Sequence, residues 1–318
     1  MAIETPTDNT TSITSLGPQG KGSFLQRLAA WVVKLRSNPS ISLEALNLKY
    51  QGRAAPQPEK LKSGLRRHFD VSEELANGCQ VYTFRQRVGG SGWHIIYTHG
   101  GAFVNPLQKA HWDIVECLLR ATGATVTVPI YPLAPEHTYS QAFEFLEAVY
   151  RDVLESVSPG RIVLCGDSAG GNLALTQALH FRDRGLPAPA RLVLFSPWLD
   201  LALGDSRARD LEPLDDMLRV DGLRQMGSWW AGSADLAEPL LSPLNADLQA
   251  LPPIDVYQGT HDILYPDART FHERVLAAGG SSRLHVTEAG FHVFMGATFT
   301  PEARRVFSRI ASDLGVAP

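Results

Sequence analysis

The sequence predicts an α/β fold in which helices cover both faces of a mostly parallel β-sheet. Two observations support this prediction. Short β-rich runs alternate along the chain with helix-length segments whose apolar residues recur every three or four positions. Parallel strands need long crossover connections, which helices usually supply, so this alternation is typical of a parallel sheet. The chain also has 318 residues, 44% of them hydrophobic, which is enough for a large core in one or two domains.

Charge and cysteine content exclude several classes of protein. The net charge is −4, and no basic run is interleaved with aromatic residues, so we expect no nucleic-acid partner. Cys79, Cys117 and Cys165 lack metal-ligand spacing and argue against a disulfide-stabilised fold. The first twenty residues lack the apolar core of a signal peptide, and no run is long enough for a transmembrane helix. We therefore expect a cytoplasmic protein without stable membrane insertion.

The first predicted element is an amphipathic helix at residues 24–35, where apolar side chains recur at spacings of one, three and four. It either packs on the rest of the fold or forms a flap over a binding site, and its few basic residues make a membrane-surface anchor the weaker interpretation. After a proline-rich bend, β-rich runs predict strands at residues 80–87, 93–98, 125–129, 161–165, 191–195, 254–258 and 283–287. Helical spacing between and after these strands predicts helices at residues 111–121, 141–156, 171–184, 267–278 and 301–314.

The interval 201–250 breaks the alternation of strands and helices. It carries charges, four glycines and the aromatic pair Trp229 and Trp230. A connection of this length inside a compact domain is expected to be an insertion with helices of its own. The predicted organisation is therefore an N-terminal segment, an α/β domain and an insertion, at residues 1–52, 53–200 with 251–318, and 201–250.

Ser168 lies in the sequence Gly166-Asp167-Ser168-Ala169-Gly170-Gly171, between a predicted strand and a predicted helix. A nucleophilic serine on such a sharp turn needs small residues two positions to either side, because a Cβ there would clash. The amides at the start of the following helix favour developing negative charge. The pattern is typical of a serine nucleophile, although a chain of this length contains roughly 0.1 to 0.2 such matches by chance.

His99-Gly100-Gly101 directly follows the predicted strand at residues 93–98. Two consecutive glycines let the backbone approach a substrate closely and turn its amides into one small space, as an oxyanion hole requires. On its own, a Gly-Gly pair after a strand is a turn, so this interpretation depends on the nucleophile downstream. We interpret His99 as a residue that organises the loop.

A serine nucleophile needs a base and an acid that orients the base. When the serine follows a strand of such a sheet, the acid and then the histidine come later in the chain, each at the carboxyl end of a strand. Asp262 and His292 follow the last two predicted strands, so we predict a triad of Ser168, Asp262 and His292. Three other side chains compete for these roles but are less well placed: Asp255, Asp267 and His261.

Several segments resemble, in order, the motifs of the hormone-sensitive lipase family of α/β-hydrolases. They are residues 99–101 (HGG), 131–137 (YPLAPEH), 166–172 (GDSAGGN), 196–200 (SPWLD) and 259–262 (GTHD). The resemblance extends from about residue 80 to the C-terminus. It implies an eight-stranded, mostly parallel sheet with a helical cap that the N-terminal segment and the insertion build. It also implies serine carboxylesterase activity without metal or coenzyme, generally on short acyl chains.

The same resemblance implies an oxyanion hole made by three backbone amides, those of Gly100, Gly101 and Ala169. The third glycine that is usual in the family is Ala102 here, so its amide is not included. Pro132 replaces the usual arginine, which removes a charge near the site. Ile263 replaces the usual proline after the acid, and this change leaves the acid in place.

The expected function is hydrolysis of small, fairly apolar carboxylic esters through an acyl-enzyme intermediate. A lactone or another activated acyl group is an alternative substrate, because the same triad serves those reactions. A non-catalytic small-molecule receptor is a less favoured alternative, since such a protein would be expected to lack a triad member. The expected partner is thus a small-molecule ester, and homodimerisation stays open.

Aromatic residues near these motifs and in the insertion are expected to line the substrate pocket: Phe103, Tyr131, Trp198, Trp229, Trp230 and Phe291. With Phe24, Leu28 and Trp31 of the first helix, the two tryptophans of the insertion are expected to form a lid. A pocket closed by bulky aromatic residues would leave room for a short acyl chain only.

Overall fold

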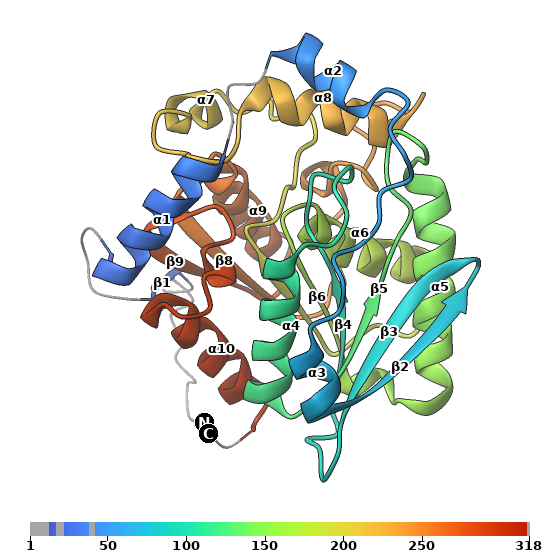
Figure 1. Cartoon of the computed structure of the whole chain (residues 1–318). Helices are drawn as coiled ribbons and strands as arrows, with labels where there is room; N and C mark the ends of the chain where they lie inside the picture. The colour runs from blue at the N-terminus through green and yellow to red at the C-terminus, as the bar shows by residue number, and fades with distance from the viewer. Residues whose placement is uncertain (1–12, 17–21, 38–41, 317–318) are drawn as a thin grey trace, which may run out of the picture.

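A computed structural model of the chain describes residues 13–16, 22–37 and 42–316. Within these residues, nine strands form one sheet in the order β1-β9-β8-β7-β6-β4-β5-β3-β2 (Figure 1). The strands are β1 (Ile13–Ser15), β2 (Phe69–Ala76), β3 (Cys79–Gln86), β4 (His94–Thr98), β5 (Thr125–Pro129), β6 (Ile162–Asp167), β7 (Arg191–Phe195), β8 (Ile254–His261) and β9 (Ser282–Phe291).

Seven strands of the sheet, from β1 at one edge to β5, are parallel to their neighbours, and only β3 and β2 at the other edge pair antiparallel. The predicted α/β fold with a mostly parallel sheet is therefore confirmed. Strand β6 lies between β4 and β7. Because parallel strands end at the same edge of a sheet, the loops that follow β4, β6, β8 and β9 all reach that edge.

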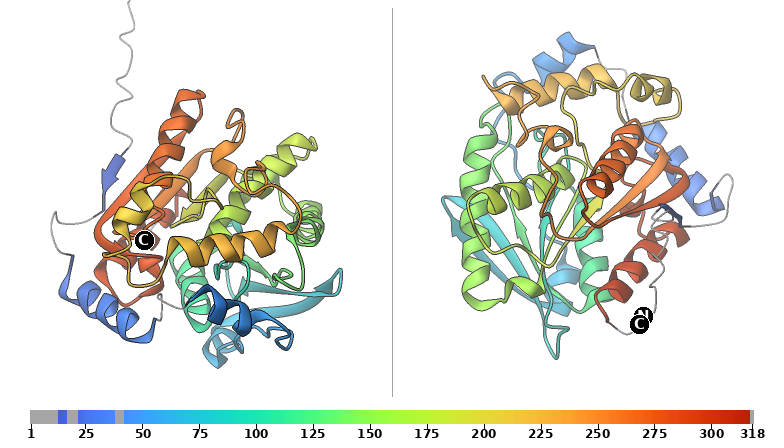
Figure 2. Two further views of the ribbon diagram at one scale, coloured as in Figure 1. Left: turned by 90° about the horizontal axis from the view of Figure 1, so that it is seen from above. Right: turned by 180° about the vertical axis from the view of Figure 1, so that it is seen from behind.

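Helices cover both faces of the sheet (Figures 1 and 2). They are α1 (Phe24–Arg36), α2 (Leu43–Tyr50), α3 (Ser63–His68), α4 (Lys109–Thr122), α5 (Tyr139–Ser156), α6 (Ala169–Asp183), α7 (Arg207–Leu211), α8 (Val220–Ala231), α9 (Tyr265–Ala277) and α10 (Pro301–Asp313). Side chains of β4 alternate between the two faces. Ile95 and Tyr97 pack with α4 and α10, whereas Ile96 packs with α5, α6 and α9. The two buried cores hold the central strands rigidly between two helical layers.

Helices α2, α7 and α8 lie over the edge of the sheet at which the parallel strands end, whereas α1 lies at the flank of the sheet, next to α10 (Figures 1 and 2). We call α1, α2 and residues 201–250 the cap. Its two parts contact each other, for example through the rings of Tyr50 and Trp229, whose centroids lie 5.4 Å apart. None of the helices in the described part of the chain is both long and apolar enough to cross a membrane.

The expectation of eight strands is wrong, because the described residues contain nine. Strand β1 was not predicted since it has only three residues, Ile13–Ser15, and pairs on one side with β9. Strand β2 was not predicted since half of its side chains are polar and it is an edge strand that pairs only with β3. Within the predicted N-terminal segment, residues 1–12, 17–21 and 38–41 lie outside the described residues.

Candidate active site

Ser168 occupies a strained turn between β6 and α6, with φ 53° and ψ −119°. The turn requires glycine nearby. A Cβ on Gly170 would lie 2.0 Å from the carbonyl oxygen of Thr98, and one on Gly166 would lie 2.2 Å from the carbonyl oxygen of Gly170. Real Cβ atoms do not approach backbone atoms so closely, so only glycine fits at either position. The turn directs Ser168 away from the sheet and towards the cap, as the sequence pattern predicts.

A chain of hydrogen bonds joins Ser168, His292 and Asp262. His292 Nε2 lies 2.9 Å from Ser168 Oγ, and His292 Nδ1 lies 2.9 Å from Asp262 Oδ2. All three side chains are buried. The carboxylate accepts a hydrogen bond from Nδ1–H, which leaves Nε2 of the neutral imidazole free to accept the serine hydroxyl proton. The structure thus brings together the three residues that the sequence places far apart.

Asp262 is itself held in place by two further donors. Gln258 Nε2 donates to Oδ2 over 2.8 Å, and the amide of Leu264 donates to Oδ1 over 2.9 Å. Burial lowers the pKa of His292, but the charge and the hydrogen bond of Asp262 raise it more, and Asp215 and Asp167 add to this effect. The net result is a pKa above the usual value for histidine, because the surrounding carboxylates stabilise the imidazolium.

The competing residues lie elsewhere. Asp255 is buried within β8, where it accepts hydrogen bonds from Arg191, Arg283 and His285. Asp267 is in the first turn of α9, and burial together with nearby carboxylates raises its pKa to about 7. Neither carboxylate contacts His292. His261 ends β8 and pairs with Phe291 in the sheet.

The amide of Gly100 is not available to a substrate oxyanion, so this part of the predicted oxyanion hole is wrong. It donates to Asp167 Oδ1 over 3.0 Å. Within the described residues no hydrogen bond engages the amides of Gly101, Ala102 and Ala169. Gly101 and Ala102 line the same cavity as Ser168, and Ala169 follows Ser168 at the start of α6. The geometry therefore leaves three backbone amides free to bind a substrate oxyanion, those of Gly101, Ala102 and Ala169.

Asp167 organises this loop from the residue before the serine. Besides the Gly100 amide, its Oδ1 accepts the hydroxyl proton of Tyr97, and its Oδ2 lies 3.5 Å from His111 Nε2. Burial raises the pKa of Asp167, but His111 and Tyr97 together lower it by more than burial raises it. The net result is a pKa below the usual value for aspartate. The role of Asp167 was not predicted from the sequence. Its position inside the GDSAGG motif was the available signal.

A cavity of about 590 Å³ opens onto Ser168 and His292. Its walls are mostly apolar and come from α1, from the insertion and from residues 101–114 and 291–299. The apolar side chains that α1 and the insertion contribute are Leu28, Ala29, Val32, Val33, Met217, Leu218, Leu223 and Met226. Phe291 also lines it, as predicted. Helix α1 thus packs on the rest of the fold and at the same time forms a wall of the cavity.

The other aromatic residues predicted for the pocket do not line it. Phe103, Tyr131, Trp198 and Trp230 are fully buried. The rings of Phe103 and Trp230 stack with centroids 4.5 Å apart, and Tyr131 donates its hydroxyl proton to the His99 carbonyl. These residues form the packed core beneath the oxyanion loop, because their large apolar area is more stable there than against water. Trp229 packs on Tyr50 instead.

The predicted lid differs in detail as well. Phe24 and Trp31 are 70% and 57% exposed, and neither lines the cavity. The buried residues of α1 are instead Gln26 and Ala29. Only Leu28 of the three predicted lid residues on α1 reaches the cavity. The part of the wall that α1 and the insertion supply therefore consists mainly of aliphatic and methionine side chains and not of the predicted aromatic ones.

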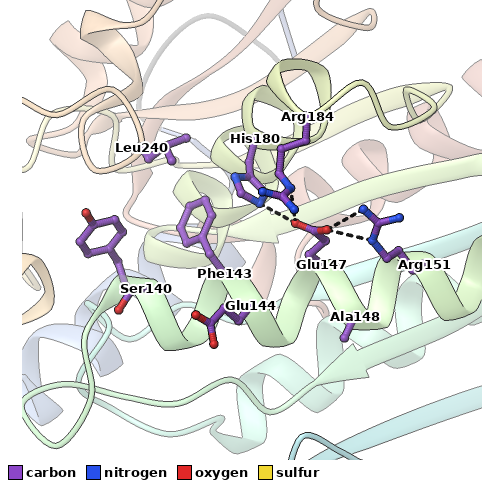
Figure 3. A pocket seen from close by; sticks show the side chains of 10 residues that line it. Ser140, Phe143, Glu144, Glu147, Ala148, Arg151, His180, Arg184 and Leu240 are labelled. Atoms are coloured by element: carbon purple, nitrogen blue, oxygen red, sulfur yellow. Dashed lines mark hydrogen bonds and ion pairs between the residues drawn. The ribbon is translucent and has the colours of Figure 1, made fainter.

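A second cavity, of about 550 Å³, lies against α5 and α6 (Figure 3). Glu147 at its centre accepts hydrogen bonds from Arg151 and His180 and pairs with Arg184. These charges satisfy one another, and no residue of the hydrogen-bonded chain at Ser168 lines this cavity. The candidate reaction site is therefore the cavity at Ser168.

Comparison with known proteins agrees with this geometry. Residues 95–296 match a family model described as an α/β hydrolase fold. The chain belongs to the α/β-hydrolase family. An acetyl-hydrolase of Streptomyces hygroscopicus is 34% identical over 204 residues, covering 64% of this chain and 68% of that protein. An esterase of Acinetobacter venetianus is 32% identical over 220 residues, covering 68% and 73%.

Solved structures of α/β-hydrolases give the same result. An esterase/lipase from an uncultured bacterium superposes with a TM-score of 0.80 at 26% identity, covering 92% of this chain and 98% of that one. An esterase of the bacterial hormone-sensitive lipase family superposes with a TM-score of 0.78 at 26% identity, covering 92% and 97%. The predicted resemblance to this family is confirmed, and the chain is an ester hydrolase.

Proposed function

We propose that this α/β-hydrolase is a serine carboxylesterase that hydrolyses short-chain, fairly apolar esters through an acyl-enzyme intermediate. The single observation that carries the proposal is the hydrogen-bonded chain from Ser168 Oγ through His292 to Asp262, with 2.9 Å at each step. This arrangement activates a serine hydroxyl without a cofactor. It lies at the floor of an apolar cavity large enough for a small ester.

The first half of the reaction acylates the serine. His292 takes the proton from Ser168 as Oγ attacks the ester carbonyl, and Asp262 holds the imidazole in the required tautomer. The amides of Gly101, Ala102 and Ala169 then hold the tetrahedral oxyanion. One such donor lowers the barrier by about 3 kcal/mol. His292 protonates the leaving alcohol, which departs and leaves the acyl group on Ser168.

The second half returns the free enzyme. His292 removes a proton from a water molecule, which attacks the acyl carbonyl, and the same amides hold the second oxyanion. His292 then protonates Ser168 Oγ as the carboxylic acid leaves. The apolar walls that the cap supplies exclude bulk water from the oxyanion site. This exclusion strengthens the hydrogen bonds to the oxyanion.

The size and the polarity of the cavity support short, apolar acyl groups. Each methylene that fits among Leu28, Val32 and Met226 contributes about 0.8 kcal/mol, until the chain meets a wall. This predicts a maximum in kcat/KM at acyl chains of roughly two to eight carbons. Two comparisons favour the same range: one relative is an acetyl-hydrolase, and a solved relative at 26% identity was soaked with p-nitrophenyl butyrate.

A series of p-nitrophenyl esters tests this proposal directly. Rates are measured for acyl chains of two to sixteen carbons under one set of conditions. We expect kcat/KM to rise from acetate, reach its maximum within roughly two to eight carbons, and fall by at least about tenfold at sixteen. Equal rates on four-carbon and sixteen-carbon esters would contradict the short-chain assignment.

A further inference from the structure

Asp215 is a buried carboxylate of the cap that has no part in the proposed reaction. It lies between α7 and α8 and is only 1% exposed. An ionised carboxylate is costly to bury unless hydrogen bonds satisfy its oxygens. The donors that satisfy Asp215 therefore indicate what it holds in place.

Both carboxylate oxygens accept backbone amide protons from two separate parts of the chain. Oδ1 accepts from Met217 over 2.8 Å and from Leu218 over 2.9 Å. Oδ2 accepts from Ile263 over 3.0 Å. Met217 and Leu218 line the cavity at Ser168, and Ile263 directly follows Asp262. One side chain thus ties a wall of the cavity to the loop that carries the acid.

The acid loop is hydrogen-bonded to a carboxylate on each of its two sides. The amide of Leu264 donates inward to Asp262 Oδ1, whereas the amide of Ile263 donates outward to the cap. Two successive amides are therefore held by two different carboxylates. A displacement of Ile263 would move Asp262 relative to His292, which it must meet within hydrogen-bond distance.

We propose that Asp215 is a positioning residue that holds the Asp262 loop against the wall of the cap and so keeps Asp262 aligned with His292. The inference rests on the proposed function, because it concerns the same triad. It gives the cap a part in aligning the catalytic groups as well as in binding substrate. The hydrogen bond also depends on Ile263, since a proline at this position has no amide proton.

Charge supports the same role. Burial raises the pKa of Asp215, Asp262 raises it further, and His292 lowers it. In return, the charge of Asp215 contributes to the raised pKa of His292. Arg219 donates to the backbone carbonyl of Asp215 and not to its carboxylate. Loss of the Asp215 charge should therefore lower the pKa of His292.

Asp215→Asn tests the proposal, because it keeps the size of the side chain but leaves one accepting oxygen. The NH₂ group of the asparagine would face a backbone N–H of either the cavity wall or the acid loop. The hydrogen bonds on that side of Asp215 are therefore lost. We expect kcat to fall roughly 10- to 100-fold and the acid limb of kcat/KM to move to lower pH. Asp221→Asn is the matched control: it removes the same charge from the same cap at a side chain that is 57% exposed and paired with Arg209. Its kinetics should equal those of the wild type.

NMR titration of His292 gives a readout that does not require turnover. Only Asp215→Asn should lower the pKa of His292 and alter the resonance of its Nδ1 proton. A variant with a lower Tm but with unchanged kcat, pH profile and His292 titration would reduce Asp215 to a structural anchor and overturn the proposal. If the wild type hydrolyses no ester, the proposed function fails, while the titration still decides the role of Asp215.

A double-mutant cycle provides a second test. Ile263→Pro removes the amide proton that Asp215 accepts and leaves the Asp215 charge in place. We expect Asp215→Asn to lower kcat by a smaller factor in the Ile263→Pro protein than in the wild type, because the bond is already lost. Equal factors in both backgrounds would show that the bond has no role in catalysis.

Discussion

The backbone amide of Gly100 donates to Oδ1 of Asp167 over 3.0 Å, so the residue before the serine holds the loop that binds the oxyanion. The same oxygen accepts the hydroxyl proton of Tyr97. The turn at Ser168 and the loop after β4 are thereby fixed to each other. This bond is also why the proposed oxyanion hole begins with the amide of Gly101 and not with that of Gly100.

Asp167→Ala should therefore impair both catalysis and stability. Gly100 and Tyr97 would each lose a buried acceptor, which costs about 1 to 3 kcal/mol per group in the free energy of unfolding. Displacement of the oxyanion amides should lower kcat by roughly 100-fold. Thermal unfolding and steady-state kinetics measure the two effects. Asp183→Ala, at a side chain 60% exposed, is the control and should change neither.

The pH profile should reflect the carboxylates around His292. The net effect of burial and of Asp262 is a pKa above 6.5. Since His292 must be neutral to act as a base, kcat/KM should increase as pH rises through that raised pKa. We expect the midpoint of the acid limb to lie above about 6.5. A midpoint below about 6 would mean that the carboxylates do not act on His292 as the geometry indicates.

Asp267→Asn separates the acid of the triad from its competitor. Burial raises the pKa of Asp267 to about 7, above its value in the unfolded chain. The folded protein therefore holds a proton that the unfolded chain releases, so the free energy of unfolding falls as pH rises from about 4 to about 7. The amide carries no charge, so the variant should have a higher Tm than the wild type at pH 8 and a similar Tm at pH 4. Its kcat should stay within about twofold, whereas Asp262→Asn should lose about 10⁴-fold. The reverse pattern would move the acid to Asp267.

Val32→Trp should shorten the preferred acyl chain. Val32 lines the cavity from α1, so a larger side chain there takes the space of several methylenes. We expect kcat/KM on octanoate to fall at least about tenfold relative to acetate. Leu35→Trp is the matched control, because Leu35 is 64% exposed on the same helix and does not line the cavity. Identical effects of the two substitutions would show that α1 does not bound the acyl site.

Local pattern accounts for most of the fold. Strands β5 and β7 match their predicted residues, and the helices that were predicted with bounds begin and end within two residues of the prediction, whereas α2 and α3 were not predicted. These elements are buried on a defined face, so the spacing of their apolar residues predicts them. Strand β2 could not be predicted from local pattern, because an edge strand exposes polar side chains and because β2 is stabilised by its pairing with β3.

The same distinction applies to the site. Ser168, Asp262 and His292 were predictable because each follows a strand and because their chemistry requires a fixed order. The roles proposed for Ala102 and Asp215 were not predictable, since they depend on which amides other groups already engage. Trp198 and Trp230 were assigned to the pocket from their size, but size alone does not tell a core residue from a lining residue.

The central claim is that Ser168 is the acylated nucleophile. The most direct test is intact-protein and peptide mass spectrometry after rapid quenching of the reaction with p-nitrophenyl butyrate, together with turnover of Ser168→Ala. We predict one butyryl group on the peptide that contains Ser168, none on the Ser168→Ala protein, and loss of nearly all its turnover. Ser140→Ala, at a serine of the second cavity, should acylate and turn over like the wild type. Full turnover by Ser168→Ala, or an acyl group on a different residue, would contradict the account.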